Sequence, residues 1–127
     1  MSSSHVAQLG IVAADPLRSV GILAILEDMP MVHALALDWD TAFENDELAG
    51  ILIDVRLNMN DLIETIQRLR RERPEMKVIA MGVPLQPNQV QAVIGAGAKG
   101  YLAETATEAE IRMAVEVVLD GSVWAPR

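Results

Sequence analysis

Short apolar runs alternate with segments of helical periodicity along nearly the whole chain. The runs lie at residues 8–14, 31–37, 51–55, 78–81 and 100–103. They show little of the apolar–polar alternation that marks a strand with one face in water, so each predicts a strand buried on both faces. The segments that follow them carry apolar residues three and four positions apart, which predicts helices. Alternating strands and helices predict an α/β fold: a doubly wound parallel sheet of five strands with helices on both faces.

Local signals mark where the predicted helices begin and end. Asp15 is a good N-cap and Pro16 fits the first helical position, so the first helix should start there. Thr41 and Thr107 are each followed three residues later by a glutamate, a capping box that predicts a helix after each threonine. The stop signals are a proline or a glycine after the remaining helices, because neither continues a helix: Pro74, Gly95 or Gly97, and Gly121.

Composition favours a single folded domain that binds no nucleic acid by itself. Of the 127 residues, 51% are hydrophobic and 22% are charged, which is a globular profile. The absence of cysteine excludes disulfides and thiolate metal sites. The formal net charge of -8 is unfavourable for contacts with nucleic-acid phosphates. One basic run is present, and we interpret it as a solvated helix end, with a docking patch for a partner as the alternative: Arg68, Arg70, Arg71 and Arg73.

The sequence shows no membrane or export signal. No apolar stretch approaches the ~20 residues needed to span a bilayer. The first residues, Met1-Ser2-Ser3-Ser4, lack the charged and apolar regions of a signal peptide. We therefore expect a soluble, cytoplasmic protein that makes no membrane contacts.

Asp54 is the residue at which we expect chemistry. It ends the apolar run 51–53, so it should lie at the carboxyl end of a buried strand. That edge of an α/β sheet is where ligands bind. An aspartate at the end of a strand is also a common turn or cap residue, so its position alone assigns no function.

Three segments, in this order along the chain, resemble the receiver domains of bacterial response regulators: Asp15-Pro16-Leu17 with Gly21, Ile51-Leu52-Ile53-Asp54, and Gly97-Ala98-Lys99-Gly100-Tyr101-Leu102. The likeness covers residues 8–127 and points to the subgroup joined to a LuxR-type helix-turn-helix domain. It implies the flavodoxin-like form of the predicted fold, with Asp54 as the phosphoryl acceptor and Tyr101 as the switch aromatic. It also implies a disordered segment at 1–7, a receiver-like domain at 8–120, and at 121–127 the start of a linker to a DNA-binding domain not in this chain.

The positions that support phosphoryl transfer in this family are altered here. Ala13 and Ala14 stand where the family has an acidic pair that helps bind Mg²⁺, and alanine offers no oxygen to a hard cation. Gly82 replaces the Ser or Thr at the end of strand four, and Glu104 replaces the family's lysine. Because the reaction depends on neutralising charge on the phosphoryl oxygens, these changes predict a degenerate site in which Asp54 is a vestigial acceptor.

Three neighbouring side chains complete the predicted site. Asp15 together with Asp54 would form at most a weak Mg²⁺ site, and no other cofactor is expected. Arg56 either folds back to pair with Asp54 or points into solvent, and the sequence favours neither. Glu104 near Asp54 would repel an incoming phosphate.

The leading interpretation is an atypical, phosphorylation-impaired receiver domain that controls a helix-turn-helix transcription factor through protein contacts. The alternatives are a working receiver that accepts phosphate on Asp54, and a flavodoxin-like module that binds a small ligand. An enzyme is least favoured, since no nucleophile–base pair is visible. The partners implied are a second copy of the chain, its own DNA-binding domain and a sensor kinase.

The last predicted helix is the candidate face for pairing two copies. Met113 and Val117 widen its apolar stripe. Extra core is the simpler interpretation, and a dimer face is the alternative. A regulator without a phosphate signal needs another route to its active geometry, and constitutive two-fold pairing is the simplest.

Overall fold

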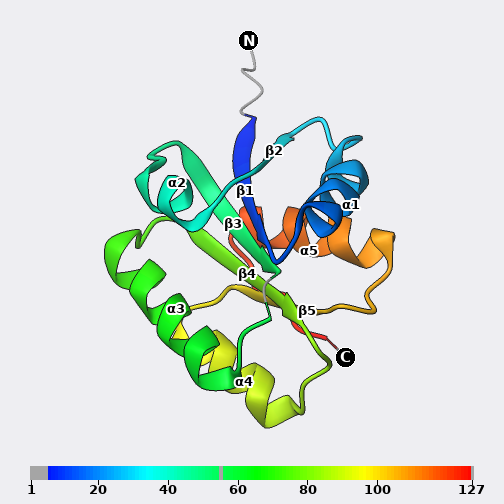
Figure 1. Ribbon diagram of the computed structural model, residues 1–127. Coiled ribbons are helices and arrows are strands. Elements are labelled where there is room, and N and C mark those ends of the chain that lie inside the picture. The colour runs from blue at the N-terminus through cyan, green and yellow to red at the C-terminus, as the bar shows by residue number, and fades with distance from the viewer. Residues whose placement is uncertain (1–5, 55, 127) are drawn as a thin grey trace.

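A five-stranded parallel sheet forms the centre of the computed structural model, which describes residues 6–54 and 56–126 (Figure 1). Its strands are β1 (Ala7–Ala13), β2 (Val32–Ala36), β3 (Leu48–Asp54), β4 (Lys77–Gly82) and β5 (Gly100–Ala103). They lie in the order β2-β1-β3-β4-β5, and every neighbouring pair is parallel. The strand order changes direction between β1 and β3, so the predicted doubly wound sheet is confirmed and its switch point lies beside Asp54.

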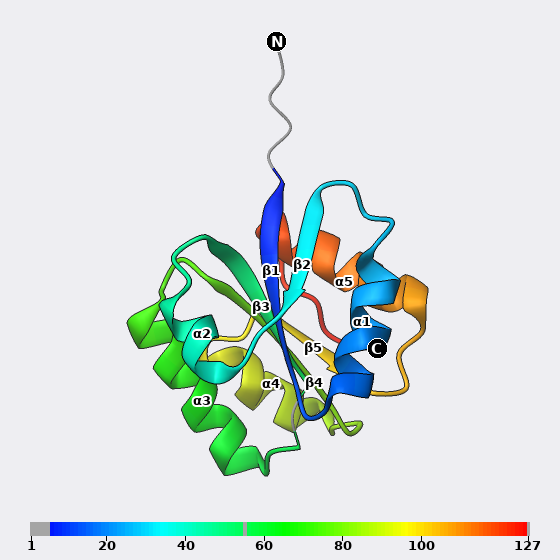
Figure 2. The ribbon, with the colours of Figure 1, turned by 45° about the horizontal axis from the view of Figure 1, so that its top comes forward.

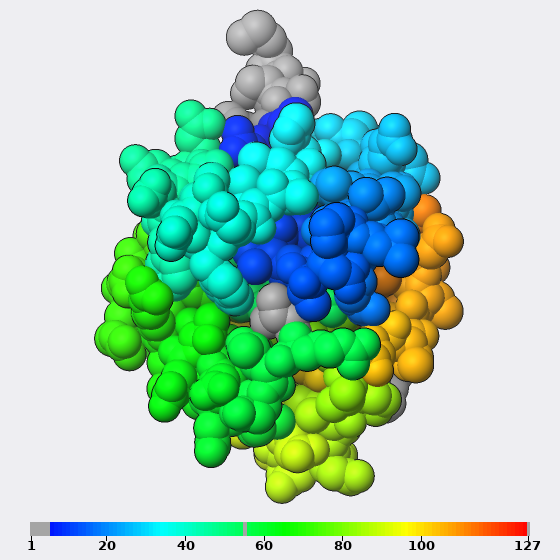
Figure 3. Space-filling model, viewed as in Figure 1, coloured from blue at the N-terminus to red at the C-terminus, as the bar shows by residue number. Residues whose placement is uncertain are grey.

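The helices cover both faces of the sheet, as predicted (Figure 2). One face carries α1 (Pro16–Leu26) and α5 (Glu108–Leu119), and the other carries α2 (Trp39–Glu44), α3 (Met59–Glu72) and α4 (Pro87–Ala96). In the space-filling view, α1 lies uncovered at the surface, in blue (Figure 3). Within the described part of the chain, no helix combines the length and apolar character needed to cross a membrane.

The strands build two separate hydrophobic cores, because successive side chains of a strand point to opposite faces of the sheet. Ile51 and Ile53 pack toward α2, α3 and α4, whereas Leu52 packs toward α1 and α5. All three are at most 1% exposed, which confirms the strand buried on both faces. β3 begins at Leu48, earlier than the predicted start at residue 51, because its pairing with β1 already exists there.

The start of α2 differs from the prediction. The helix begins at Trp39, and its N-cap is Asp38, whose carboxylate accepts a hydrogen bond from the backbone N–H of Thr41 at 2.8 Å. The predicted cap at Thr41 is therefore wrong, since Thr41 lies inside the helix. The earlier start lets the Trp39 ring approach that of Phe43, with centroids 6.2 Å apart. The aspartate cap and this aromatic contact together outweigh the threonine signal.

The other predicted helix ends are confirmed. Asp15 caps α1 by accepting a hydrogen bond from the backbone N–H of Arg18 at 2.9 Å. Thr107 opens the reciprocal capping box of α5. α3 stops before Pro74, and α4 ends at Gly97, whose φ of 130° favours glycine.

The segment after α5 lies along the outer edge of β5. The N–H of Trp124 donates to the carbonyl of Lys99 at 2.9 Å, and the N–H of Tyr101 donates to the carbonyl of Trp124 at 3.1 Å. The predicted linker at 121–127 is therefore held on the sheet as far as Trp124, because an edge strand offers backbone groups that need partners. At the other end, β1 already includes Ala7, so the predicted disordered segment 1–7 extends too far; residues 1–5 lie outside the described residues. The division into a domain and a linker stays a prediction.

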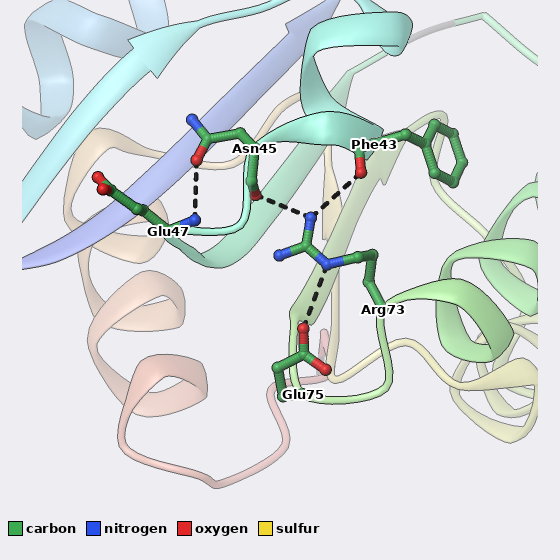
Figure 4. A network of polar contacts seen from close by, with 5 residues as sticks. All are labelled: Phe43, Asn45, Glu47, Arg73 and Glu75. Atoms are coloured by element: carbon green, nitrogen blue, oxygen red, sulfur yellow. Dashed lines mark hydrogen bonds and ion pairs between the residues drawn. The ribbon is translucent and has the colours of Figure 1, made fainter.

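Arg73 departs from the interpretation of the basic run as a solvated helix end. It is only 9% exposed, and its guanidinium reaches the end of α2 (Figure 4). Nη1 donates to the carbonyls of Asn45 at 2.8 Å and Phe43 at 3.4 Å, while Nε donates to Glu75 at 3.2 Å. A cation suits the last carbonyls of a helix, which lack partners within the helix and carry the negative end of its dipole. Arg73 therefore ties the end of α3 to the end of α2.

Replacing Arg73 by alanine should lower the free energy of unfolding by about 2–3 kcal/mol, because the carbonyls of Phe43 and Asn45 lose a charged donor. Arg71→Ala is the matched control on the same helix turn: Arg71 is exposed, and its removal should change stability by less than about 0.5 kcal/mol. Urea unfolding of both variants measures the difference. Equal effects would show that Arg73 contributes surface charge only.

Candidate functional site

Asp54 is the last residue of β3 and lies where the carboxyl ends of the strands meet. It is 5% exposed. Its register partner on β1 is Ala13, and its carbonyl accepts a hydrogen bond from the N–H of Ala14 at 2.8 Å. A cleft of about 450 Å³ opens above it, at the edge that the sequence predicts for ligands. The side chains that line the cleft and could do chemistry are Arg18, Asp54, Arg56, Tyr101 and Glu104.

The carboxylate of Asp54 forms an ion pair with an arginine of the same chain. Nε of Arg18 donates to Oδ2 of Asp54 at 2.5 Å, and the two side chains are 31% and 7% exposed. Asp15 fixes this arrangement, because it caps α1 through the backbone N–H of Arg18. The hydrogen bond to Asp54 raises the pKa of Arg18 above its usual value, against the opposing effect of burial. The negative charges of Asp54, Glu104 and Asp15 raise that pKa further.

Sequence reasoning did not identify Arg18. It considered Arg56 as a partner of Asp54, but Arg56 is exposed at the rim of the cleft and the ion pair is made by Arg18. A signal for Arg18 did exist: it lies in the first turn of the helix after β1, and β1 neighbours β3 in a doubly wound sheet. A long cation at that position reaches the end of β3.

The residues present do not fit a Mg²⁺ ion. Ala13 and Ala14 offer no side-chain oxygen. Of the two carboxylates that remain, Asp15 accepts a hydrogen bond from the backbone of Arg18 and Asp54 accepts one from its side chain. Among the described residues no cluster of three or more His, Asp or Glu side chains could hold a metal ion. Mg²⁺ requires several oxygen ligands in near-octahedral geometry, so weak binding through Asp15 and Asp54 stays a prediction without a ligand set to support it.

The space beside Gly82 is filled by Tyr101. The Tyr101 side chain is 2% exposed, and its hydroxyl donates to the carbonyl of Val83 at 2.6 Å. A Cβ atom on Gly82 would lie 3.0 Å from that hydroxyl, so a serine or threonine there would compete with the tyrosine for space. Burial raises the pKa of Tyr101 to about 12, and the charges of Glu104 and Asp54 add to the effect. Glycine at position 82 thus leaves room for the tyrosine hydroxyl in its present place.

Glu104 follows β5 and places a negative charge beside the cleft. Its N–H donates to the carbonyl of Gly82 at 2.6 Å, which holds this backbone close to the end of β4. The residue is exposed and lines the cleft that contains Asp54. Five of the predicted site residues line this cleft together with Arg18: Asp54, Arg56, Gly82, Tyr101 and Glu104. Ala13, Ala14 and Asp15 are not among the lining residues.

The Arg18–Asp54 pair can be measured with a double-mutant cycle. Arg18→Ala should lower the free energy of unfolding by about 2 kcal/mol, because the carboxylate of Asp54 is left with little access to water. Asp54→Ala should cost less, since the more exposed Arg18 can turn to solvent. The two variants and their combination should give a coupling energy of at least about 1 kcal/mol in urea unfolding. Strictly additive effects would refute the pair in solution.

Tyr101 is the single tyrosine of the chain, so the absorbance of tyrosinate reports it alone. We expect a titration midpoint of about 12 in the folded protein and about 10 in denaturant. Because the folded state holds this proton more tightly, the stabilisation is complete below pH about 10 and is lost as the pH rises toward about 12.

Gly82→Ser is the paired variant for this titration. Its Cβ should shift the tyrosine hydroxyl, and the midpoint should fall below about 12 because the shifted hydroxyl gains access to water. A midpoint near the denatured value in the unaltered protein would mean that the ring does not stay inside the fold.

No protein-family model and no curated protein matches the sequence. Solved structures do match. The receiver domain of RcsB from Salmonella enterica serovar Typhimurium, determined with a phosphomimetic BeF3-, is 16% identical with a TM-score of 0.82, and the match covers 97% of this chain and 95% of that one. A LuxR-family DNA-binding response regulator from Silicibacter pomeroyi is 22% identical with a TM-score of 0.81, covering 96% and 98% of the two chains.

The signal receiver domain of NarL from Mycobacterium tuberculosis gives a similar result: 22% identity and a TM-score of 0.76, with 92% of this chain and 98% of that chain covered. The matches extend over nearly the whole of each chain although few residues are identical, so the shared property is the three-dimensional arrangement. The chain therefore has the flavodoxin-like α/β fold of response-regulator receiver domains.

Proposed function

We propose that this domain is a receiver-type module that works without phosphorylation of Asp54. The observation that carries the proposal is the hydrogen bond from Arg18 to the buried carboxylate of Asp54. A carboxylate that attacks phosphorus needs a free oxygen lone pair and cations on the incoming phosphoryl group. Here Arg18 occupies one carboxylate oxygen, and Glu104 adds an anion at the cleft.

The contacts at two positions of the site support the same conclusion. Gly82 makes room for the Tyr101 ring, and Arg18 balances the charge of Asp54. These contacts hold the site in one arrangement without a bound group. We infer that the domain presents one permanent surface to its partners, in place of a surface that changes with phosphate.

The partner that we propose is a DNA-binding domain in the same regulator. The support is the likeness to LuxR-family response regulators, one of which is described as DNA-binding. The segment up to Trp124 follows β5 and bonds to the backbone of Tyr101. A domain that continues from this segment would therefore be held by the same strand that carries Tyr101. With a net charge of -8, this domain would contribute protein contacts and not phosphate contacts to DNA binding.

Self-association is part of the proposal. Met113 on α5 is 53% exposed, so its interpretation as extra core is wrong: it lies on the outer side of the helix. Val117 is half-buried. Three alternatives stay predictions: control by a sensor kinase, a working acceptor at Asp54, and a small ligand in the cleft. The phosphodonor experiment below tests the working acceptor.

Incubation with a small phosphodonor and Mg²⁺ should leave the intact mass of the protein unchanged, because Asp54 is paired and the metal ligands are missing. Arg18→Ala should also stay unmodified, since it frees the carboxylate but restores no metal ligand. Asp54→Ala is the control for modification elsewhere. Stoichiometric addition of one phosphoryl group, lost in Asp54→Ala, would establish a working acceptor; addition to Arg18→Ala alone would make Arg18 the sole block.

A further inference from the structure

The outer face of α1 has no polar side chain. The helix packs Ile22 and Leu26 into the core, where they are 5% and 1% exposed. On the opposite side Leu17 is 81% exposed and Val20 is 62% exposed. Ala24 is exposed on the same side, one turn after Val20. A surface helix is normally polar on its outer face, and a helix that is apolar all round is normally buried. This face of α1 is therefore expected to be covered by a partner.

The charges around α1 allow a second copy of this chain to approach there. Two copies, each with a net charge of -8, repel one another over most of their surfaces. α1 contains no acidic residue, and its single cation, Arg18, is turned toward Asp54. Asp15 and Glu27 lie beyond the two ends of the apolar face that Leu17, Val20 and Ala24 form. Association through α1 thus meets the least repulsion, and it should become stronger as salt screens the flanking acids.

The side-chain sizes along the stripe fit a two-fold axis. In an antiparallel pair of α1 helices centred between residues 20 and 21, Leu17 faces Ala24 of the second copy and Val20 faces Gly21 of the second copy. Each large side chain then meets a small one. A Cβ atom built on Gly21 finds no atom within 4 Å, so the space above this glycine is open. Isologous contacts of this kind are the commonest way in which identical chains pair.

We propose that the stripe formed by Leu17, Val20, Gly21 and Ala24 is a self-association surface that packs against the same stripe of a second copy in antiparallel orientation. This inference rests on the proposed self-association and places it on α1 in place of α5. Arg18 lies on the same helix and ties its first turn to β3 through Asp54, so the stripe is held in position without a phosphate signal. A three-turn helix pair buries less than the roughly 800 Å² per partner of a standard stable interface, so the dimer is weak and depends on protein concentration.

Cysteine cross-linking tests the orientation directly, because the chain has no cysteine of its own. An equimolar mixture of Leu17→Cys and Ala24→Cys should form a mixed disulfide dimer under mild oxidation. Leu17→Cys alone should form several-fold less, since two copies of residue 17 lie at opposite ends of the pair. Met113→Cys, an exposed apolar position on α5, is the control for random collision. Cross-linking of Leu17→Cys with itself as efficient as in the mixture would overturn the antiparallel arrangement.

Sedimentation over a wide concentration range separates this inference from self-association itself. Val20→Glu should raise the dissociation constant ~10-fold or more, whereas Met113→Glu should leave it unchanged. Val20→Lys should also dissociate, and mixing it with Val20→Glu should restore pairing, because opposite charges then meet across the axis. Both positions are exposed, so circular dichroism should show unchanged folds.

Self-association and its placement on α1 predict different outcomes of this measurement. A dimer that survives Val20→Glu but is lost in Met113→Glu would move the interface to α5 and overturn the inference, while self-association would stand. A dimer indifferent to both would place the interface elsewhere and overturn it as well. A monomer at all concentrations would overturn both.

Discussion

The hydrogen bond between Arg18 and Asp54 joins the first turn of α1 to the end of β3 at the centre of the sheet. A carboxylate that is 7% exposed is costly unless a cation and hydrogen bonds compensate for the lost water. Arg18 supplies both from within the chain. The position of Arg18 depends on the helix cap at Asp15 and on the pairing of β1 with β3. The cap and the strand order therefore both determine the Arg18–Asp54 contact.

This internal cation changes how the rest of the site is understood. Ala13 and Ala14 offer no side-chain oxygen to a cation, and Arg18 places a positive charge beside Asp54 from within the chain. Gly82 leaves no hole, because the side chain of Tyr101 fills the space beside it and the tyrosine hydroxyl donates to the carbonyl of Val83. These contacts together stabilise one packed arrangement of the site.

The same helix that carries Arg18 also carries the exposed apolar stripe. Its inner face packs in the core formed with α5, its first turn is tied to β3, and its outer face is uncovered at the surface (Figure 3). A helix fixed at so many points presents its outer side chains in a defined geometry, which lowers the conformational entropy lost on pairing. The cleft at Asp54 and the proposed contact surface are in this way connected through α1.

The sequence by itself predicted five strands, a doubly wound parallel sheet and most helix ends, because apolar periodicity and capping residues act within a few positions. The expected burial on both faces is wrong for β2, which lies at the edge of the sheet and has no buried residue. It also located Asp54 and the altered positions around it. The start of α2 after Asp38, one turn before the predicted cap at Thr41, depends on the aspartate cap together with the contact of Trp39 with Phe43. The tertiary structure alone decided that Arg18 and not Arg56 pairs with Asp54, and that Arg73 is buried. Those contacts join residues far apart in the chain, and the reach of a long cation depends on where two elements meet in space, which no local pattern encodes.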